Sequence, residues 1–86
     1  MRNSELVSRK CGRILRSALM LNNIQEKEAA HLLGVTVRTV QQWMNGNLRW
    51  TVLMVTELQR KVFDPAGFNW LEYFYKYISL FMREED

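Results

Sequence analysis

Polar side chains that could read the edges of DNA bases recur at helical spacing in the stretch 37–45. Arg38 and Gln42 are four residues apart, and Gln41 follows Arg38 by three, so a helix presents all three on one side. Arginine can donate two parallel hydrogen bonds to a guanine edge, and glutamine pairs well with adenine. Val37 precedes them and suits contact with a thymine methyl group. We therefore expect these four residues to contact base edges.

Two short helical patterns that meet at Gly34 would hold this surface in place. Gly34 can end the first helix in a left-handed conformation at little cost, and Thr36 is a good N-cap for the second helix. Ala30 is small enough to let the two helices cross closely. The apolar residues that face inward are Ala29, Ala30, Leu33, Val35, Val40 and Trp43. This spacing predicts a helix-turn-helix over residues 25–45.

The stretch resembles the helix-turn-helix of phage repressor and Cro-type regulators, the XRE-like family. The residues that carry the resemblance are Ala30, Gly34, Val35, Val40 and Trp43, followed by the polar-Gly pair Asn45-Gly46. The resemblance covers roughly residues 13–62 and implies that the second helix enters the major groove of DNA. One position departs from the family: where a glutamine often touches the DNA backbone, this chain has Glu26, whose carboxylate would repel phosphate.

A second set of polar residues suits contact with DNA phosphates, which fixes the register of a protein on the duplex. In the family that the chain resembles, the connection after the second helix follows the DNA backbone. That connection here contains Asn47 and Arg49, and Lys27 lies at the start of the first helix. The expected phosphate contacts are Thr36, Thr39, Asn45, Asn47, Arg49 and Lys27.

The distribution of charge favours the same half of the chain. Residues 1–49 hold eight Lys and Arg against three Asp and Glu, whereas residues 50–86 hold four against six. The half that contains the helix-turn-helix thus carries a net charge of +5, and the whole chain carries +3. A positive field attracts phosphate and speeds association with nucleic acid.

The length of 86 residues and the 48% content of apolar residues predict a single domain, residues 1–86, with a modest core. No alternating run with hairpin signals occurs, so the predicted fold class is all-α, a compact bundle of about five helices. On the first helix, an inward stripe runs from Val7 to Leu21 through Cys11, Ile14 and Ala18. Asn69 and Glu72 are spaced as a capping box. The expected helices cover about residues 5–21, 25–33, 37–45, 51–63 and 70–83.

The last helix, within residues 69–83, is apolar almost all round. Its polar stripe contains only Glu72, Lys76, Ser79 and Arg83, and a monomer of this size can hardly cover the remaining faces. We therefore expect a homodimer through this C-terminal helix, since aromatic residues are enriched at such interfaces. The expected interface residues are Trp70, Tyr73, Phe74, Tyr77 and Phe81. The opposing interpretation is that this helix is simply a core helix wrapped by the other four.

Several functions are not expected. Cys11 has no nearby base, and His31 lacks partners at metal-ligand spacing, so we expect no enzyme activity, no metal and no cofactor. No glycine-rich phosphate loop occurs, and no small-molecule ligand is expected. The apolar C-terminal run is too short for a membrane span and carries charges. A single cysteine and the lack of a signal-peptide pattern fit the cytoplasm.

The sequence thus predicts a phage or prokaryotic transcriptional regulator, such as a repressor, that binds double-stranded DNA at a two-fold operator. Two alternatives remain at this point. The first is an excisionase-like recombination directionality factor, although such proteins often carry a β-wing where residues 47–63 look helical. The second is a protein-interaction module, such as an antirepressor or antitoxin, that keeps the helix-turn-helix shape and docks through its aromatic helix.

Overall fold

The computed structural model describes residues 3–84, and the side chains of residues 6–83. Within that range the chain forms five α-helices and one π-helical turn, without a strand. The elements are α1 (Asn3–Leu21), α2 (Glu26–Leu33), α3 (Val37–Met44), α4 (Val52–Leu58), η1 (Gln59–Phe63) and α5 (Trp70–Glu84). The predicted all-α fold with five helices is confirmed.

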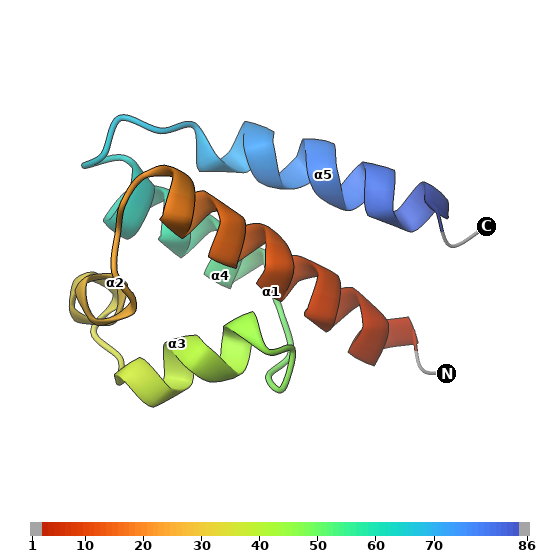
Figure 1. Cartoon of the computed structure of the whole chain (residues 1–86), viewed down its shortest axis with the longest axis horizontal. Coiled ribbons are helices and arrows are strands. Elements are labelled where there is room, and N and C mark those ends of the chain that lie inside the picture. The colour runs from red at the N-terminus through yellow and green to blue at the C-terminus, as the bar shows by residue number, and fades with distance from the viewer. Residues whose placement is uncertain (1–2, 85–86) are drawn as a thin grey trace.

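Helix α1 is the central element of the bundle. It runs antiparallel to α5 on one side and packs against α3 on the other, so the start of α1 and the end of α5 lie at the same end of the molecule (Figure 1). Helix α2, seen end-on in Figure 1, packs on α3 and on η1. Helix α3 therefore has one side turned toward α1 and α2 and the other turned away from the bundle.

Aromatic side chains fill the space between α5 and the α4–η1 segment. Trp70 and Phe63 are both 0% exposed, and their rings stack with centroids 4.9 Å apart. The indole N–H of Trp70 donates to the carbonyl of Val55 at 2.9 Å, so its polar atom is satisfied inside the core. Trp50 stacks on Phe74 at 5.8 Å and closes the cluster from the α3–α4 connection.

The predicted helix over residues 51–63 is present, but its last part is widened. From Gln59 to Phe63 the chain forms the π-helical η1, in which the Asp64 N–H donates to the Gln59 carbonyl at 2.7 Å. The wider turn lets Leu58, Val62 and Phe63 all face the core. The Gln59 amide nitrogen donates to an Asp64 carboxylate oxygen at 2.6 Å and to the Phe68 carbonyl at 3.0 Å.

Two details of the predicted helices differ from the sequence pattern. Leu21 was expected to face inward, yet it is 64% exposed because the core stripe of α1 turns toward Leu15 and Leu19. At the start of α5, the Glu72 N–H donates to Asn69 Oδ1 at 3.2 Å, as a capping box requires. The return bond comes from the Asn69 side chain, whose Nδ2 lies 3.3 Å from Glu72 Oε1, rather than from its backbone.

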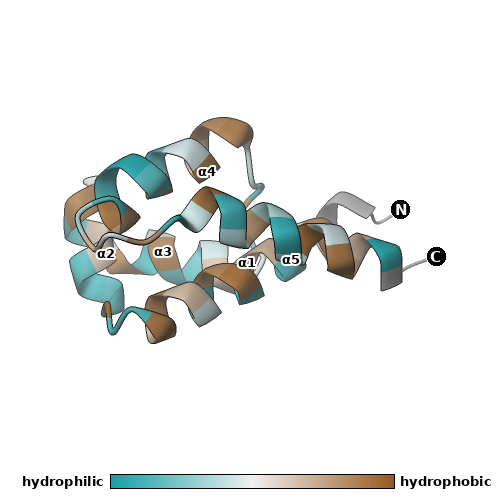
Figure 2. Ribbon diagram, turned by 90° about the horizontal axis from the view of Figure 1, so that it is seen from above, coloured by the Kyte–Doolittle hydropathy of each residue, from teal (hydrophilic) through white to brown (hydrophobic). Residues whose placement is uncertain are grey.

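The outer side of α5 is mixed in character. Figure 2 shows hydrophilic and hydrophobic residues alternating along its ribbon, and the exposed apolar side chains there are Tyr75, Leu80 and Met82. Within residues 3–84, no helix combines the length and the apolar character needed to cross a membrane.

Candidate nucleic-acid interface

The turn between α2 and α3 occupies three residues. Gly34 has φ +75° in the left-handed region, which a glycine adopts without steric cost. The following N–H, from Val35, donates to the Ala30 carbonyl at 3.0 Å. Thr36 then caps α3, since its Oγ1 accepts from the Thr39 N–H at 3.1 Å. The predicted roles of Gly34 and Thr36 in this turn are confirmed.

The inner side of α3 anchors the helix in the core. Val40 is 1% exposed and Met44 is 4% exposed, while Trp43 is half-buried against the same cluster. Gly12 of α1 faces the end of α3, where an added Cβ would clash with the carbonyls of Trp43 and Met44. The sequence pattern predicts Val40 and Trp43 on this side but not Met44, whose place there follows from its spacing of four from Val40.

The outer side of α3 carries Arg38 and Gln42, one helical turn apart. Arg38 is exposed and Gln42 is half-exposed. Within residues 6–83, neither side chain has a hydrogen-bond or ion-pair partner. Both can therefore make new hydrogen bonds without breaking existing ones.

The other two candidates for base contact are placed differently. Gln41 donates from its amide nitrogen to Glu26 Oε1 at 3.0 Å, which ties α3 to the first residue of α2. Val37 is half-buried at the edge of a groove between α1, α2 and α3. Arg38 and Gln42 thus have no hydrogen-bond partner among the described side chains. Gln41 bonds to Glu26, and Val37 packs at the edge of the groove.

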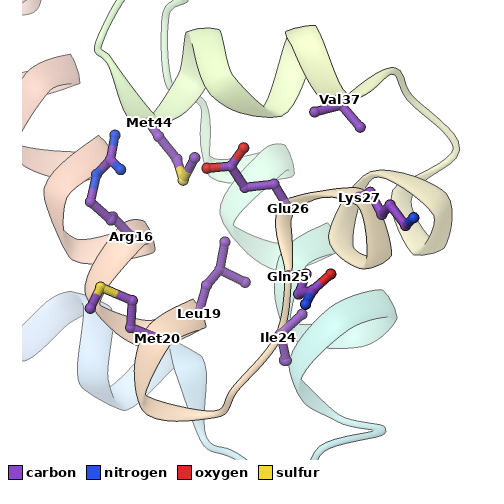
Figure 3. Close-up of a pocket in the computed structure, with 9 residues that line it drawn as sticks. All are labelled: Arg16, Leu19, Met20, Ile24, Gln25, Glu26, Lys27, Val37 and Met44. Atoms are coloured by element: carbon purple, nitrogen blue, oxygen red, sulfur yellow. The ribbon is translucent and has the colours of Figure 1, made fainter.

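The groove beside α3 has a volume of about 460 Å³ and is open to solvent. Its lining residues are drawn in Figure 3; the apolar ones are Leu19, Met20, Ile24, Val37 and Met44, and the polar ones are Arg16, Gln25, Glu26 and Lys27. Figure 3 shows the Arg16 guanidinium directed toward the end of α3. Its Nη2 donates to Asn45 Oδ1 at 3.3 Å. Two side-chain hydrogen bonds therefore join one side of α3 to its neighbours: Gln41 bonds to Glu26 of α2, and Asn45 bonds to Arg16 of α1.

The predicted phosphate contacts lie around both ends of α3. Thr36 is exposed, and its hydroxyl lies 3.0 Å from that of the half-buried Thr39, so the two hydroxyls share one hydrogen bond within the capping turn. The connection after α3 exposes Asn47 and Arg49, and the first turn of α2 exposes Lys27. Asn45 is exposed and accepts from Arg16.

Three cationic side chains on or near α3 have no carboxylate within ion-pair distance among the described side chains. Among the described side chains, Lys27, Arg38 and Arg49 form no ion pair. By contrast, Arg60 and Lys61 lie 2.8 and 3.0 Å from oxygens of Glu57, where Lys61 and Arg60 lower the pKa of that carboxyl. An unpaired surface cation keeps its charge available for a phosphate.

The predicted dimer interface needs a correction at two of its five residues. Trp70 is 0% exposed and Phe74 is 5% exposed, because both pack into the core of their own chain against Phe63 and Trp50. They cannot contact a second copy in this fold. Tyr73, Tyr77 and Phe81 are half-buried between α1 and α5 and keep part of their surface accessible.

The one cysteine sits in the core. Cys11 is 3% exposed, and burial raises the pKa of its thiol to about 11. A thiol that stays protonated at neutral pH is a poor nucleophile. Its position is that of a small core residue, as the sequence predicts.

The inner side of α3 is thus anchored in the core through Val40 and Met44. One edge is bonded to the rest of the protein through Gln41 and Asn45, and the outer side exposes Arg38 and Gln42.

Comparisons of the chain with protein-family models, with curated proteins and with solved structures give no match.

Proposed function

We propose that this chain is a sequence-specific DNA-binding transcriptional regulator that inserts α3 into the major groove. The observation that carries the proposal is the pair Arg38 and Gln42 on the outer side of a helix whose inner side is buried. Both side chains are accessible, and neither has a hydrogen-bond or ion-pair partner among the described side chains. Their spacing of one turn matches two neighbouring base edges in the groove. The unpaired cations Lys27 and Arg49 support the proposal, since they could contact phosphates on either side of α3.

The first experiment is binding of the purified chain to random-sequence duplexes at several salt concentrations, followed by selection of the bound fraction. We expect affinity to fall steeply with salt and one palindromic sequence to be enriched. No binding at low salt would overturn the proposal.

Arg38→Ala then tests base readout on the selected duplex. The variant should weaken specific binding by about 1–3 kcal/mol and relax the preference at one base pair. Equal loss on every duplex would make Arg38 a phosphate contact instead. Arg60→Ala is the matched control, because Arg60 is an exposed arginine on η1 that pairs with Glu57.

The proposed regulator acts in the cytoplasm as a homodimer, so that two copies of α3 read the two halves of a palindrome about 34 Å apart. The candidate contact surface is the outer side of α5, where Tyr75, Leu80 and Met82 are 49%, 39% and 41% exposed. Pairing of two modules raises affinity because the second half-site is bound intramolecularly.

Sedimentation of Leu80→Glu tests the dimer, and Leu53→Glu is its control, because Leu53 is an exposed leucine on α4 rather than on α5. We expect Leu80→Glu to be monomeric and to bind the palindrome at least tenfold more weakly, whereas Leu53→Glu should resemble the wild type. A wild-type chain that stays monomeric at micromolar concentrations, both alone and on the palindrome, would exclude the homodimer.

A further inference from the structure

Helix α1 touches the end of α3 more closely than any side chain would allow. At Gly12, an added Cβ would lie 2.6 Å from the Trp43 carbonyl oxygen, well inside van der Waals contact. The backbone of α1 therefore rests directly on the last turn of α3. Residues of α1 that share the side of Gly12 are brought next to the helix that we propose reads DNA.

Two arginines of α1 flank this crossing. Arg9 lies beside Gly46, where an added Cβ would be 2.7 Å from Arg9 Cα. Arg16 reaches the other side and donates to Asn45 Oδ1 at 3.3 Å. The two residues are separated by seven positions, about 10 Å along the helix axis. Both are exposed, so two cationic groups border the Asn45–Gly46 end of α3.

Neither arginine has a carboxylate partner within residues 6–83. Arg16 has only the neutral oxygen of Asn45, which leaves its other donors available. A guanidinium group in this state binds phosphate oxygens well, because its donors match their geometry.

Arg13 provides an internal contrast on the same helix. It is also exposed, but its guanidinium carbon lies 5.9 Å from the centre of the Phe81 ring on α5. Arg13 thus belongs to the α1–α5 side of the molecule, away from the end of α3. The three side chains are chemically identical, but Arg9 and Arg16 lie beside the end of α3 whereas Arg13 lies beside α5.

We propose that Arg9 and Arg16 form a phosphate clamp, a site on α1 that binds the DNA backbone beside the bases read by α3. The proposal rests on the DNA-binding function proposed above. It adds α1 to the proposed nucleic-acid surface, beside α2 and α3. The opposing account gives the two arginines a purely structural role, as cations that stabilise the carboxyl end of α3.

The test measures binding of Arg9→Ala, Arg16→Ala and Arg13→Ala to the selected palindrome and to an unrelated duplex across a range of salt. For the first two variants we expect affinity to fall about three- to tenfold on both duplexes alike. The slope of log affinity against log salt should also decrease by about 0.9 for each lost contact. Arg13→Ala should keep the slope of the wild type.

Arg16→Lys and the thermal midpoints of the free variants separate the clamp from a structural role. Lysine keeps the positive charge, so Arg16→Lys should restore most of the salt slope. A lowered midpoint for Arg9→Ala and Arg16→Ala with an unchanged slope would overturn the clamp. So would a slope that falls equally in Arg13→Ala.

Failure of the clamp and failure of DNA binding give different results. If the wild-type chain binds no duplex at low salt, the proposed function and the clamp both fall. If Arg38→Ala loses sequence preference while Arg9→Ala and Arg16→Ala keep the wild-type slope, only the clamp is wrong.

Discussion

The amide nitrogen of Gln41 lies 3.0 Å from a carboxylate oxygen of Glu26, which joins the middle of α3 to the first residue of α2. An acidic residue in the first turn of a helix is favourable, because the helix dipole is positive there. The same carboxylate, however, sits at the edge of the surface that we propose approaches DNA. Glu26 therefore suits the start of α2, whereas its charge would repel DNA phosphates at the proposed surface.

Glu26→Gln should tighten binding to any duplex by about 1 kcal/mol at low salt, because it removes a negative charge near the phosphates while keeping a side chain that can bond to Gln41. The gain should shrink as salt rises. Dissociation constants on two unrelated duplexes at low and high salt measure both effects. Glu28→Gln is the control, since Glu28 is exposed on the same helix. Equal tightening by Glu28→Gln would assign the effect to net charge rather than to the position of Glu26.

Gly12→Ala should destabilise the chain by about 1–3 kcal/mol, because the new methyl group would press on the carbonyls of Trp43 and Met44 and force α1 away from α3. Chemical denaturation measures this loss. Ser79→Ala on the exposed side of α5 should change stability by less than about 0.5 kcal/mol.

Gly34→Ala separates steric crowding from backbone strain. Nothing lies within 4 Å of an added Cβ at Gly34, yet its φ of +75° is disfavoured for alanine. We expect a loss of about 1–2 kcal/mol from strain alone. DNA binding measured well below the unfolding midpoint should survive in Gly34→Ala and weaken in Gly12→Ala, which shifts α3 itself. Wild-type affinity in Gly12→Ala would show that the close contact does not position α3.

The elements that depend on neighbouring residues were predictable from the sequence. Gly34 and Thr36 fixed the turn between α2 and α3 because backbone preference and capping act over a few residues. The spacing of Val40 and Trp43 likewise identified the inner side of α3. Because Arg38 and Gln42 do not lie on that side, the same spacing predicted that they face outward.

The features that depend on contacts between distant residues were not predictable. Whether Trp70 faces a partner or its own core depends on α4 and η1, which supply Val55 and Phe63 as its neighbours. An aromatic run looks the same in either case. The hydrogen bond between Arg16 and Asn45 joins residues 29 positions apart, so no short-range spacing in the sequence predicts it. Such pairings follow from the crossing of whole helices.

Gln59 holds the start of α5 against η1, and its loss should loosen that junction. Its side chain donates to Asp64 and to the Phe68 carbonyl, and its Oε1 accepts from the Leu71 N–H at 2.9 Å. Gln59→Ala should cost about 1–3 kcal/mol, because it leaves the half-buried Leu71 N–H without its acceptor. Denaturation gives the loss, and faster hydrogen exchange of the Leu71 amide would locate it.

The control for Gln59 is a glutamine that forms no such bonds. Gln25 precedes α2, is exposed, and makes no capping hydrogen bond with its side chain. Gln25→Ala should therefore remain within about 0.5 kcal/mol of the wild type. Equal losses in the two variants would mean that the three hydrogen bonds of Gln59 contribute nothing specific.

Cys11 should make the stability of the chain depend on alkaline pH. Burial raises the pKa of its thiol from 9.0 to about 11, because the charged thiolate is disfavoured inside the core. A pKa raised by folding adds stability that is complete below pH 9 and is lost as pH rises toward 11. Cys11→Ala removes this dependence, so the wild type should lose stability relative to the variant over that interval. Denaturation midpoints of both chains measure the difference, and parallel pH profiles would contradict it.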